Sequence, residues 1–316
     1  MNKIKVGFIG TGYMANEYAK VLSKNFPFKI SLVGAINKSN SRIKDFINKY
    51  KILKQYKNIN QMMNYAKPDV VIVSVNELST YGVIKELCKF KCVCLIEKPV
   101  GIDVRQNKKI LSLKKNKNFF SFIALNRRFY SSVISTNKIL ENDSSKRIIK
   151  IFDQENIIIP KKNNVPKKVT NNWMYANSIH MLDFVFIFGR GKIKKIKTLN
   201  KKNYLSKKTI SSRIEFTSGD IVDYYCTWNR PAPWSVQIST EKYFLELKPI
   251  EKLSYLTDQN RKWINVEISK NDKEFKPGIF LQTLQLFNFF KNKNSKLKDL
   301  NYSKKIMNLI RDIYFD

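Results

Sequence analysis

The chain of 316 residues contains one histidine, four cysteines and only 25 acidic residues against 59 basic ones. A zinc site with two histidine ligands cannot form within one chain, because His180 is the only imidazole. No apolar run approaches the roughly 18 residues that a membrane span needs, and the apolar stretch at the N-terminus is too short for a signal peptide. We therefore expect a cytoplasmic protein with no metal centre and no membrane partner.

The cysteines do not form a metal-binding pattern, because Cys88, Cys92 and Cys94 lie close together but the chain has no C-x-x-C pair. Cys92 and Cys94 fall in one apolar run, where we expect small buried side chains on one face of a strand. Hydrophobic residues make up 43% of the chain, which suffices for packed cores. The length suggests two domains.

The net charge of +34 raises the question of a nucleic-acid partner. We do not expect one, because only ten of the basic residues are arginines, and base recognition and phosphate clamping favour arginine. The 49 lysines are spread along the whole chain among many Asn, Ile, Phe and Tyr residues, which is typical of a genome biased towards A and T. Selection for an anionic partner, such as a phosphorylated substrate or cofactor, is the alternative.

The first residues predict a strand, a glycine turn and a helix. An apolar run over residues 3–9 is followed directly by a G-x-G-x-x-A motif and then by a helical pattern. This is the context of a dinucleotide-binding turn, in which Gly10 permits the tight turn and Gly12 lets a pyrophosphate approach the backbone. Ala15 is small enough for close packing of helix on strand, and the helix N-terminus offers N–H groups to the phosphates. The residues expected around the phosphates are Gly10, Thr11, Gly12, Tyr13 and Met14.

The end of the second predicted strand, residues 30–36, bears on the choice of cofactor. An NAD enzyme places an Asp or Glu there to bind the adenosine ribose, whereas this chain continues with polar and basic residues and no carboxylate. Lys38, Ser39 and Arg42 could hold a ribose phosphate that a carboxylate would repel, so we favour NADP over NAD. The alternative is that Asn37 hydrogen-bonds an unphosphorylated ribose unaided.

Two further apolar runs, residues 70–75 and 92–96, are separated by a helical pattern over residues 81–89, as in a doubly wound parallel sheet. Ligands bind outside the carboxyl ends of such strands. The residues at these two strand ends, which we add to the cofactor-binding set, are Ser74, Val75, Asn76, Glu97 and Lys98.

After about residue 120 the pattern changes to short β-rich runs separated by turns, which indicates an antiparallel sheet. The runs cover residues 147–151, 196–199, 210–216, 221–227, 236–238, 244–247 and 263–268. The predicted fold class is α/β, with a doubly wound parallel sheet over residues 1–120. Residues 121–316 are expected to form an α+β domain with a large, mainly antiparallel sheet, and the closing helix to pack back on the first domain.

Together these motifs resemble those of the glucose–fructose oxidoreductase / inositol dehydrogenase / MocA (Gfo/Idh/MocA) family. In the family's order, the matching segments are Gly10-x-Gly12-x-x-Ala15, Pro68 to Val73 running into Asn76, Glu97-Lys98-Pro99, Asn126-Arg127-Arg128-Phe129 and His180-x-x-Asp183. The resemblance covers nearly the whole chain. It implies a Rossmann domain, a tightly held nicotinamide cofactor, and hydride transfer at a carbinol or ketone of a sugar, cyclitol or nucleotide sugar. It also implies a homodimer or homotetramer.

The family's catalytic lysine maps onto Lys98 and its histidine onto His180. Alcohol oxidation needs a base at the reacting hydroxyl, and in the reverse direction the Lys98 ammonium would protonate the developing alkoxide. Asp183, one helical turn from His180, could orient the imidazole. The chain departs from the family at Ala176, where members often carry an Asp four residues before the histidine.

Substrate contacts are expected from Arg127, Tyr130, Asn177, His180, Asp183 and Trp234. Trp234 could pack on a sugar face, with a purely structural role as the alternative. The lysine-rich segment 161–168 is expected to be a loop that suits a phosphorylated or nucleotide-linked substrate, and the histidine helix is expected to end at a left-handed Gly189. The alternative function, motivated by Ala176, is a catalytically inactive dinucleotide-binding sensor or partner protein of the same fold.

Overall fold

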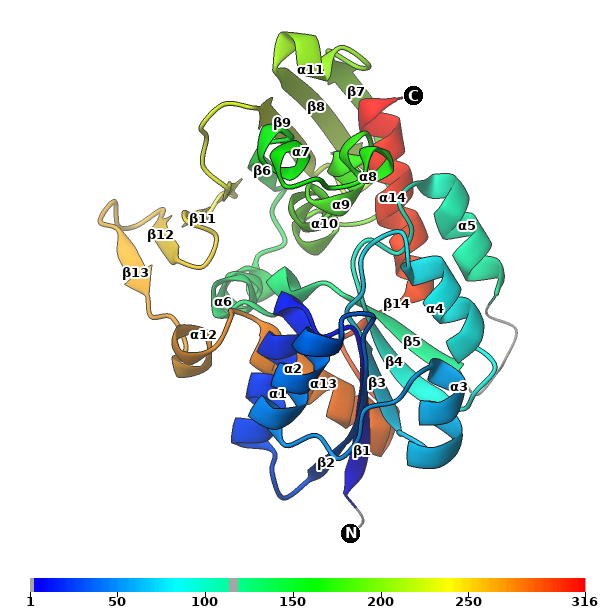
Figure 1. Cartoon of the computed structure of the whole chain (residues 1–316). Helices are drawn as coiled ribbons and strands as arrows, with labels where there is room; N and C mark the ends of the chain where they lie inside the picture. The colour runs from blue at the N-terminus through cyan, green and yellow to red at the C-terminus, as the bar shows by residue number, and fades with distance from the viewer. Residues whose placement is uncertain (1–2, 114–118, 316) are drawn as a thin grey trace. The chain divides into compact units, whose positions relative to one another are not determined.

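The computed structural model describes residues 3–113 and 119–315 and contains two compact units, each built around one sheet (Figure 1). The first unit comprises residues 1–126 and 274–304, and the second comprises residues 127–273 and 305–316. The expected boundary at residue 120 falls inside a strand, β5 (Phe119–Ala124), so the chain leaves the first unit only after that strand is complete. It returns to the first unit with residues 274–304, which the sequence patterns did not anticipate.

The first sheet has the order β14-β5-β4-β3-β1-β2. Its strands are β1 (Ile4–Ile9), β2 (Ile30–Ile36), β3 (Val70–Val73), β4 (Cys92–Glu97), β5 and β14 (Lys298–Asp299). All pairs are parallel except β14 with β5, which confirms the doubly wound parallel sheet. From β1 the chain goes to β2 on one side and later to β3 on the other, so the topological switch point, where such sheets bind ligands, lies between β1 and β3.

Helices cover both faces of this sheet, because its central strands are apolar on both sides and need cover on both. One face carries α1 (Tyr13–Asn25), α2 (Asn40–Tyr50) and α13 (Ile279–Asn292); the other carries α3 (Ile59–Gln61), α4 (Thr80–Leu87) and α5 (Val104–Ser112) (Figure 1). A short π-helical stretch, Met62–Ala66, extends α3. All four residues of β3 are at most 1% exposed, as the unbroken apolar run predicts.

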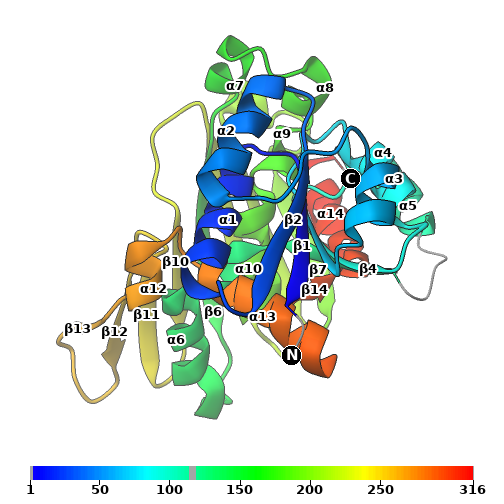
Figure 2. The ribbon, with the colours of Figure 1, turned by 60° about the horizontal axis from the view of Figure 1, so that its bottom comes forward.

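The second sheet has the order β13-β12-β11-β10-β6-β9-β8-β7. Its strands are β6 (Ile148–Glu155), β7 (Ile193–Leu199), β8 (Thr209–Phe216), β9 (Ile221–Trp228), β10 (Ser235–Ser239), β11 (Tyr243–Leu247), β12 (Leu253–Thr257) and β13 (Ile264–Val266). Only β6 and β9 pair in parallel, so the expected mainly antiparallel sheet is confirmed. Figure 2 shows β11, β12 and β13 side by side at one end; the sequence patterns missed β12.

Seven further helices and two 3-10 turns belong wholly to the second unit or begin or end in it. They are η2 (Asn126–Phe129), α6 (Ser131–Ile139), η3 (Leu140–Asn142), α7 (Ile158–Lys162), α8 (Lys167–Thr170), α9 (Trp173–Ala176), α10 (Ile179–Phe188), α11 (Tyr204–Lys207) and α12 (Lys270–Glu274). None of the helices in the described part of the chain is long and apolar enough to cross a bilayer.

The closing helix α14 (Leu300–Tyr314) is divided between the units: residues 300–304 group with the first unit, and residue 305 onwards with the second. Tyr314 is fully buried, and its ring lies 5.0 Å from that of Tyr204 and 5.9 Å from that of Trp228. Its hydroxyl lies 3.1 Å from the hydroxyl of Tyr224. These large aromatic side chains anchor the helix end on the second sheet.

Helix α10 ends at Gly189, but this glycine is not left-handed as expected, because its φ is −80°. The need for glycine comes from close packing. A Cβ atom at this position would lie 2.6 Å from the Phe216 ring and 2.7 Å from the Val185 carbonyl oxygen. The helix end therefore requires glycine because no side chain fits there.

Candidate functional site

The glycine turn after β1 has the geometry that a dinucleotide-binding turn requires. Gly10 has a φ of +89°, and a Cβ atom there would lie 2.0 Å from the Ser74 carbonyl oxygen, so only glycine fits. Gly12 precedes α1, and a Cβ atom there would meet nothing within 4 Å. Ala15, in the first turn of α1, is fully buried. The open surface over Gly12, at the N-terminus of a helix of 13 residues, fits the pyrophosphate of a dinucleotide.

The polar residues after β2 lie beside this turn. The Asn37 side-chain amide donates a 2.7 Å hydrogen bond to the Thr11 hydroxyl, and the side-chain oxygen Oδ1 of Asn37 accepts one of 3.0 Å from the backbone N–H of Lys38. A hollow of about 270 Å³ next to the turn is lined by Thr11, Asn16, Arg42, Asp45, Phe46 and Lys49. The structure thus brings Arg42 to Thr11, and adds Asp45 and Lys49, which the strand-end pattern could not single out because they lie further along α2.

The carboxyl ends of β3 and β4 lie on the same edge of the sheet as the glycine turn. Ile9 pairs with Val73, and Val73 pairs with Ile96, so the residues that follow each of them sit in one row. Ser74 and Lys98 are therefore on the edge where the glycine turn lies. The side-chain oxygen of Asn76 accepts a 3.0 Å hydrogen bond from the backbone N–H of Ser79, which shapes the turn into α4.

Glu97, the residue before Lys98, faces the interior of the first unit. Its carboxyl lies 3.2 Å from the hydroxyl of Tyr18, which also bonds to the Gln282 side-chain oxygen at 2.7 Å. Burial raises the pKa of Glu97 to about 7, against the lowering effect of the Lys98 charge. The Lys98–Pro99 peptide bond is cis. The Glu97 side chain thus anchors the strand end that carries Lys98 to α1 and α13.

In the second unit, Arg127 lies beside two of the other expected substrate residues, Trp234 and Tyr130. Its guanidinium lies 4.9 Å above the Trp234 ring, and its Nη1 lies 2.9 Å from the sulfur of Met181. Tyr130 is 4% exposed, and its pKa is raised to about 12 by burial, against the effect of Arg127. The indole N–H of Trp234 donates to the Gln154 carbonyl oxygen at 3.0 Å, with the residue 38% exposed. Arg127 already occupies one face of the indole.

Asp183, expected to orient the imidazole, is held by a partner that the sequence patterns missed. Both of its carboxylate oxygens accept 2.6 Å hydrogen bonds from Arg128, and the Asp183 side chain is 2% exposed. Arg128 is the arginine of the N-x-R-F segment, but no local pattern pairs it with Asp183, which lies 55 positions away. The ion pair ties η2, just before α6, to α10.

The turn just before the helix that carries His180 is hydrogen-bonded to β6. The histidine helix forms as α10, which begins at Ile179, and Asn177 and Ser178 link it to α9. Asn177 donates to one oxygen of Glu155 at 2.9 Å, and the Ser178 hydroxyl to the other at 2.8 Å. His180 itself is 8% exposed. Glu155 was not predicted, although an acid at a core position of a strand is a signal that sequence reasoning can find.

Only the middle of the lysine-rich segment 161–168, residues 163–166, is the loop that was expected. Its first residues complete α7, and its last begin α8. A hollow of about 460 Å³ between the two is lined by Lys161, Asn164, Val165, Pro166, Lys167, Thr170 and Asn171. The basic side chains are therefore presented by short helices.

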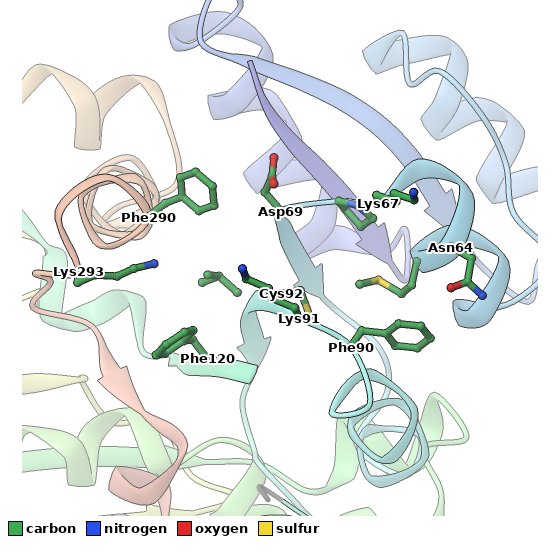
Figure 3. A pocket seen from close by; sticks show the side chains of 12 residues that line it. Asn64, Lys67, Asp69, Phe90, Lys91, Cys92, Phe120, Phe290 and Lys293 are labelled. Atoms are coloured by element: carbon green, nitrogen blue, oxygen red, sulfur yellow. The ribbon is translucent and has the colours of Figure 1, made fainter. Parts of the chain in front are cut away.

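A larger hollow of about 600 Å³ lies at the opposite edge of the first sheet (Figure 3). It is lined at the amino ends of the strands by residues such as Asp69, Cys92 and Phe120, and from α13 by Phe290. Because the glycine turn lies at the carboxyl ends, this hollow is not where the dinucleotide motif would hold a cofactor.

Among the described residues, no group of three or more His, Cys, Asp or Glu side chains could hold a metal ion. Cys92 and Cys94 are 4% and 0% exposed, with sulfurs 3.6 Å apart on one face of β4, as the strand pattern predicts.

Comparison with known proteins agrees with this geometry. Residues 4–123 match the model of the GFO_IDH_MocA family, described as an oxidoreductase family with an NAD-binding Rossmann fold. None of the curated proteins that were searched matches the chain.

Solved structures of similar fold align over nearly the whole chain at low sequence identity. UDP-N-acetylglucosamine 3-dehydrogenase GnnA from Acidithiobacillus ferrooxidans is 12% identical, with coverage of 99% of this chain and 97% of that one and a TM-score of 0.77. The dehydrogenase MviM from Clostridium difficile is 18% identical, with coverage of 99% of both chains and a TM-score of 0.78. A putative myo-inositol dehydrogenase from Sinorhizobium meliloti is 12% identical, with coverage of 98% and 95% and a TM-score of 0.74.

These structures establish a shared fold, and the family match lies on the domain that carries the glycine turn and the Glu97-Lys98-Pro99 segment. The match agrees with the resemblance that the motifs indicate: residues 4–123, the Rossmann domain, are similar to the Gfo/Idh/MocA family of oxidoreductases.

Proposed function

We propose that the protein is an NAD(P)-dependent dehydrogenase or reductase that acts on a CH–OH group of a sugar, cyclitol or nucleotide sugar. The observation that carries this proposal is the joint placement of the glycine turn and Lys98 at one edge of the Rossmann sheet. Ligands of such sheets bind outside this edge. The nicotinamide cofactor, when bound, would accept or supply the hydride.

In this proposal, Lys98 moves the proton at the reacting hydroxyl. Its ammonium protonates the developing alkoxide in reduction, and its neutral amine removes the hydroxyl proton in oxidation. His180 hydrogen-bonds the same hydroxyl and helps to orient it. Arg127, Tyr130 and Trp234 bind the rest of the substrate.

The substrate class is proposed from an aromatic ring and basic side chains in the second unit, and from the names of enzymes that share the fold. Trp234 offers a partly exposed ring that suits the C–H face of a sugar. Structures of this fold include enzymes named for UDP-N-acetylglucosamine and for myo-inositol. Lys161 and Lys167, presented by α7 and α8, suit the phosphates of a nucleotide sugar.

The test is to screen sugars, cyclitols and nucleotide sugars with NAD and NADP while monitoring absorbance of the reduced cofactor. Turnover with a member of these classes is the expected result. Cofactor binding without turnover on any of them would instead favour the sensor or partner protein, for which the absence of a carboxylate at Ala176 is the motivating observation.

We further propose that the preferred cofactor is NADP, because the two basic residues that line the hollow beside the glycine turn, Arg42 and Lys49, outnumber its one carboxylate, Asp45. Arg42→Ala is expected to weaken NADPH binding about 10- to 100-fold, since a hydrogen bond to a charged group contributes roughly 1.5–3 kcal/mol. NADH binding should change little. Titration of cofactor fluorescence measures both affinities, and Lys44→Ala, on the same helix but outside the hollow, serves as the matched control. An equal loss for both cofactors would contradict a phosphate contact, and so would no loss.

We propose that the protein forms a homodimer or homotetramer in which the outward face of the second sheet contacts the same face of another copy. This face carries Ile148, Leu199 and Tyr225, which are 49%, 71% and 38% exposed. The strand register places Phe152 beside Tyr225, with ring centroids 6.3 Å apart. Exposed apolar side chains on a sheet face are typical of protein interfaces. Sedimentation equilibrium measures the assembly directly.

A further inference from the structure

Buried and more exposed residues alternate along β6, and two of its buried positions hold acidic residues. Ile149 and Ile151 are fully buried, and the next two residues in the same alternation, Asp153 and Glu155, are each 1% exposed. Burying a carboxyl group costs free energy unless hydrogen bonds compensate. An acid at such a position therefore calls for a specific partner.

The partners of Glu155 are consecutive residues of one turn. Asn177 Nδ2 donates to Oε2 at 2.9 Å, and Ser178 Oγ donates to Oε1 at 2.8 Å. Ser178 immediately precedes α10, and His180 is the second residue of that helix. Because the carboxyl group holds both residues at the helix start, it fixes the position from which the imidazole projects.

The surroundings of Glu155 favour a neutral carboxyl group. Burial raises the pKa of Glu155 to about 8, and the charge of Asp153 adds to the rise. Burial also raises the pKa of Asp153, against hydrogen bonds from Tyr224 and Ser178 and the charge of Arg127.

The other titratable groups facing this pair are Tyr224 and Cys226 on β9 and Tyr314 on α14, and burial raises the pKa of all three well above the usual range. These three groups therefore remain neutral while the acids titrate. A neutral Glu155 can accept a hydrogen bond from Asn177, and it can either accept a hydrogen bond from the Ser178 hydroxyl or donate one to it.

We propose that Glu155 is a positioning residue, whose hydrogen bonds to Asn177 and Ser178 hold His180 in place for its contact with the substrate. The inference rests on the proposed function for its catalytic consequence. Its structural part, that Glu155 fixes the position of the His180 side chain, does not depend on the identity of a substrate and can be measured separately.

Two substitutions separate hydrogen bonding from mere filling of space. Glu155→Gln keeps both bonds, because the amide oxygen accepts from Asn177 and the amide nitrogen donates to Ser178. Glu155→Leu fills a similar volume and removes both bonds. Gln154→Leu, on the same strand but pointing to the other face, is the matched control.

The first measurement uses the fact that His180 is the chain's only histidine, so a protein labelled with ¹³C-histidine gives one set of imidazole signals. Glu155→Leu is expected to shift or broaden the Cε1–H signal, whereas Glu155→Gln and Gln154→Leu leave it close to wild type. In the wild type, this signal should also report a titration near pH 8 that Glu155→Gln lacks.

The second measurement is turnover. Glu155→Leu is expected to lower kcat on the order of 10²-fold, as misplacement of a catalytic group does, with the cofactor Kd unchanged. Glu155→Gln should retain most of the wild-type kcat and lose an inflection near pH 8 in the pH profile.

An unshifted His180 signal in a folded Glu155→Leu protein would overturn the inference, and so would equal defects in the Gln and Leu variants. A protein with no turnover on any substrate, but with the expected His180 shifts, would refute the proposed function and leave the positioning role supported.

Discussion

Lys98→Ala and His180→Ala are each expected to abolish measurable turnover while leaving cofactor affinity close to that of the wild type. A positioned general acid or base contributes about 10²–10⁴-fold to rate, and loss of the proton carrier at the reacting oxygen removes that factor from kcat. The phosphates of the cofactor depend instead on the backbone of the glycine turn, which neither substitution touches. Stopped-flow or steady-state absorbance at the reduced-cofactor band measures kcat, and fluorescence titration measures the Kd.

The chain has 49 lysines, so a control is needed to show that the loss of turnover is specific to Lys98. Lys293→Ala, at the opposite edge of the Rossmann sheet, removes the same charge from the same unit and is expected to keep wild-type kcat. His180→Asn keeps one hydrogen-bonding group and should retain more activity than His180→Ala. Wild-type turnover in a Lys98→Ala, His180→Ala double variant would refute the assignment of both residues.

The first domain was predictable because each of its signals is local. An apolar run, a glycine turn and a helix follow one another within residues 4–25, and the φ of +89° at Gly10 and the open space at Gly12 are what that order requires. Strand ends were equally readable, because parallel strands bring their carboxyl ends to one edge whatever the intervening helices do. Lys98 was placed on that edge by this rule alone.

The second domain was less predictable because its decisive contacts join distant residues. Glu155 and Asn177 are 22 positions apart, and Arg128 and Asp183 are 55 apart, so no local pattern pairs them. Helical spacing places Asp183 one turn from His180, but it cannot reveal that an arginine from another element also binds this carboxylate. Gly189 shows the same limit, since the close approach of Phe216 that requires glycine comes from β8.

The ion pair between Arg128 and Asp183 should be a large contributor to the stability of the second unit. Their side chains are 13% and 2% exposed, and the geometry is bidentate. Asp183→Asn leaves the guanidinium buried without its counter-charge, which typically costs about 3–5 kcal/mol. The nearby Lys305 increases this cost, because its ammonium already experiences the charge of Arg128 and would lose the compensating charge of Asp183. We expect the melting temperature of this unit to fall by roughly 6–20 °C.

Two further variants decide whether the cost arises from the unpaired charge. Asp223→Asn breaks the bidentate pair with Arg213, whose side chain is 56% exposed, and exposed pairs contribute only about 0–1 kcal/mol. Arg128→Met with Asp183→Leu removes both buried charges and should recover most of the lost stability, since a well-packed apolar pair can replace a buried ion pair at little cost. Calorimetry of the three proteins at one pH gives the comparison. A loss in Asp183→Asn no larger than that in Asp223→Asn would mean that the buried pair contributes no more than a solvent-exposed one.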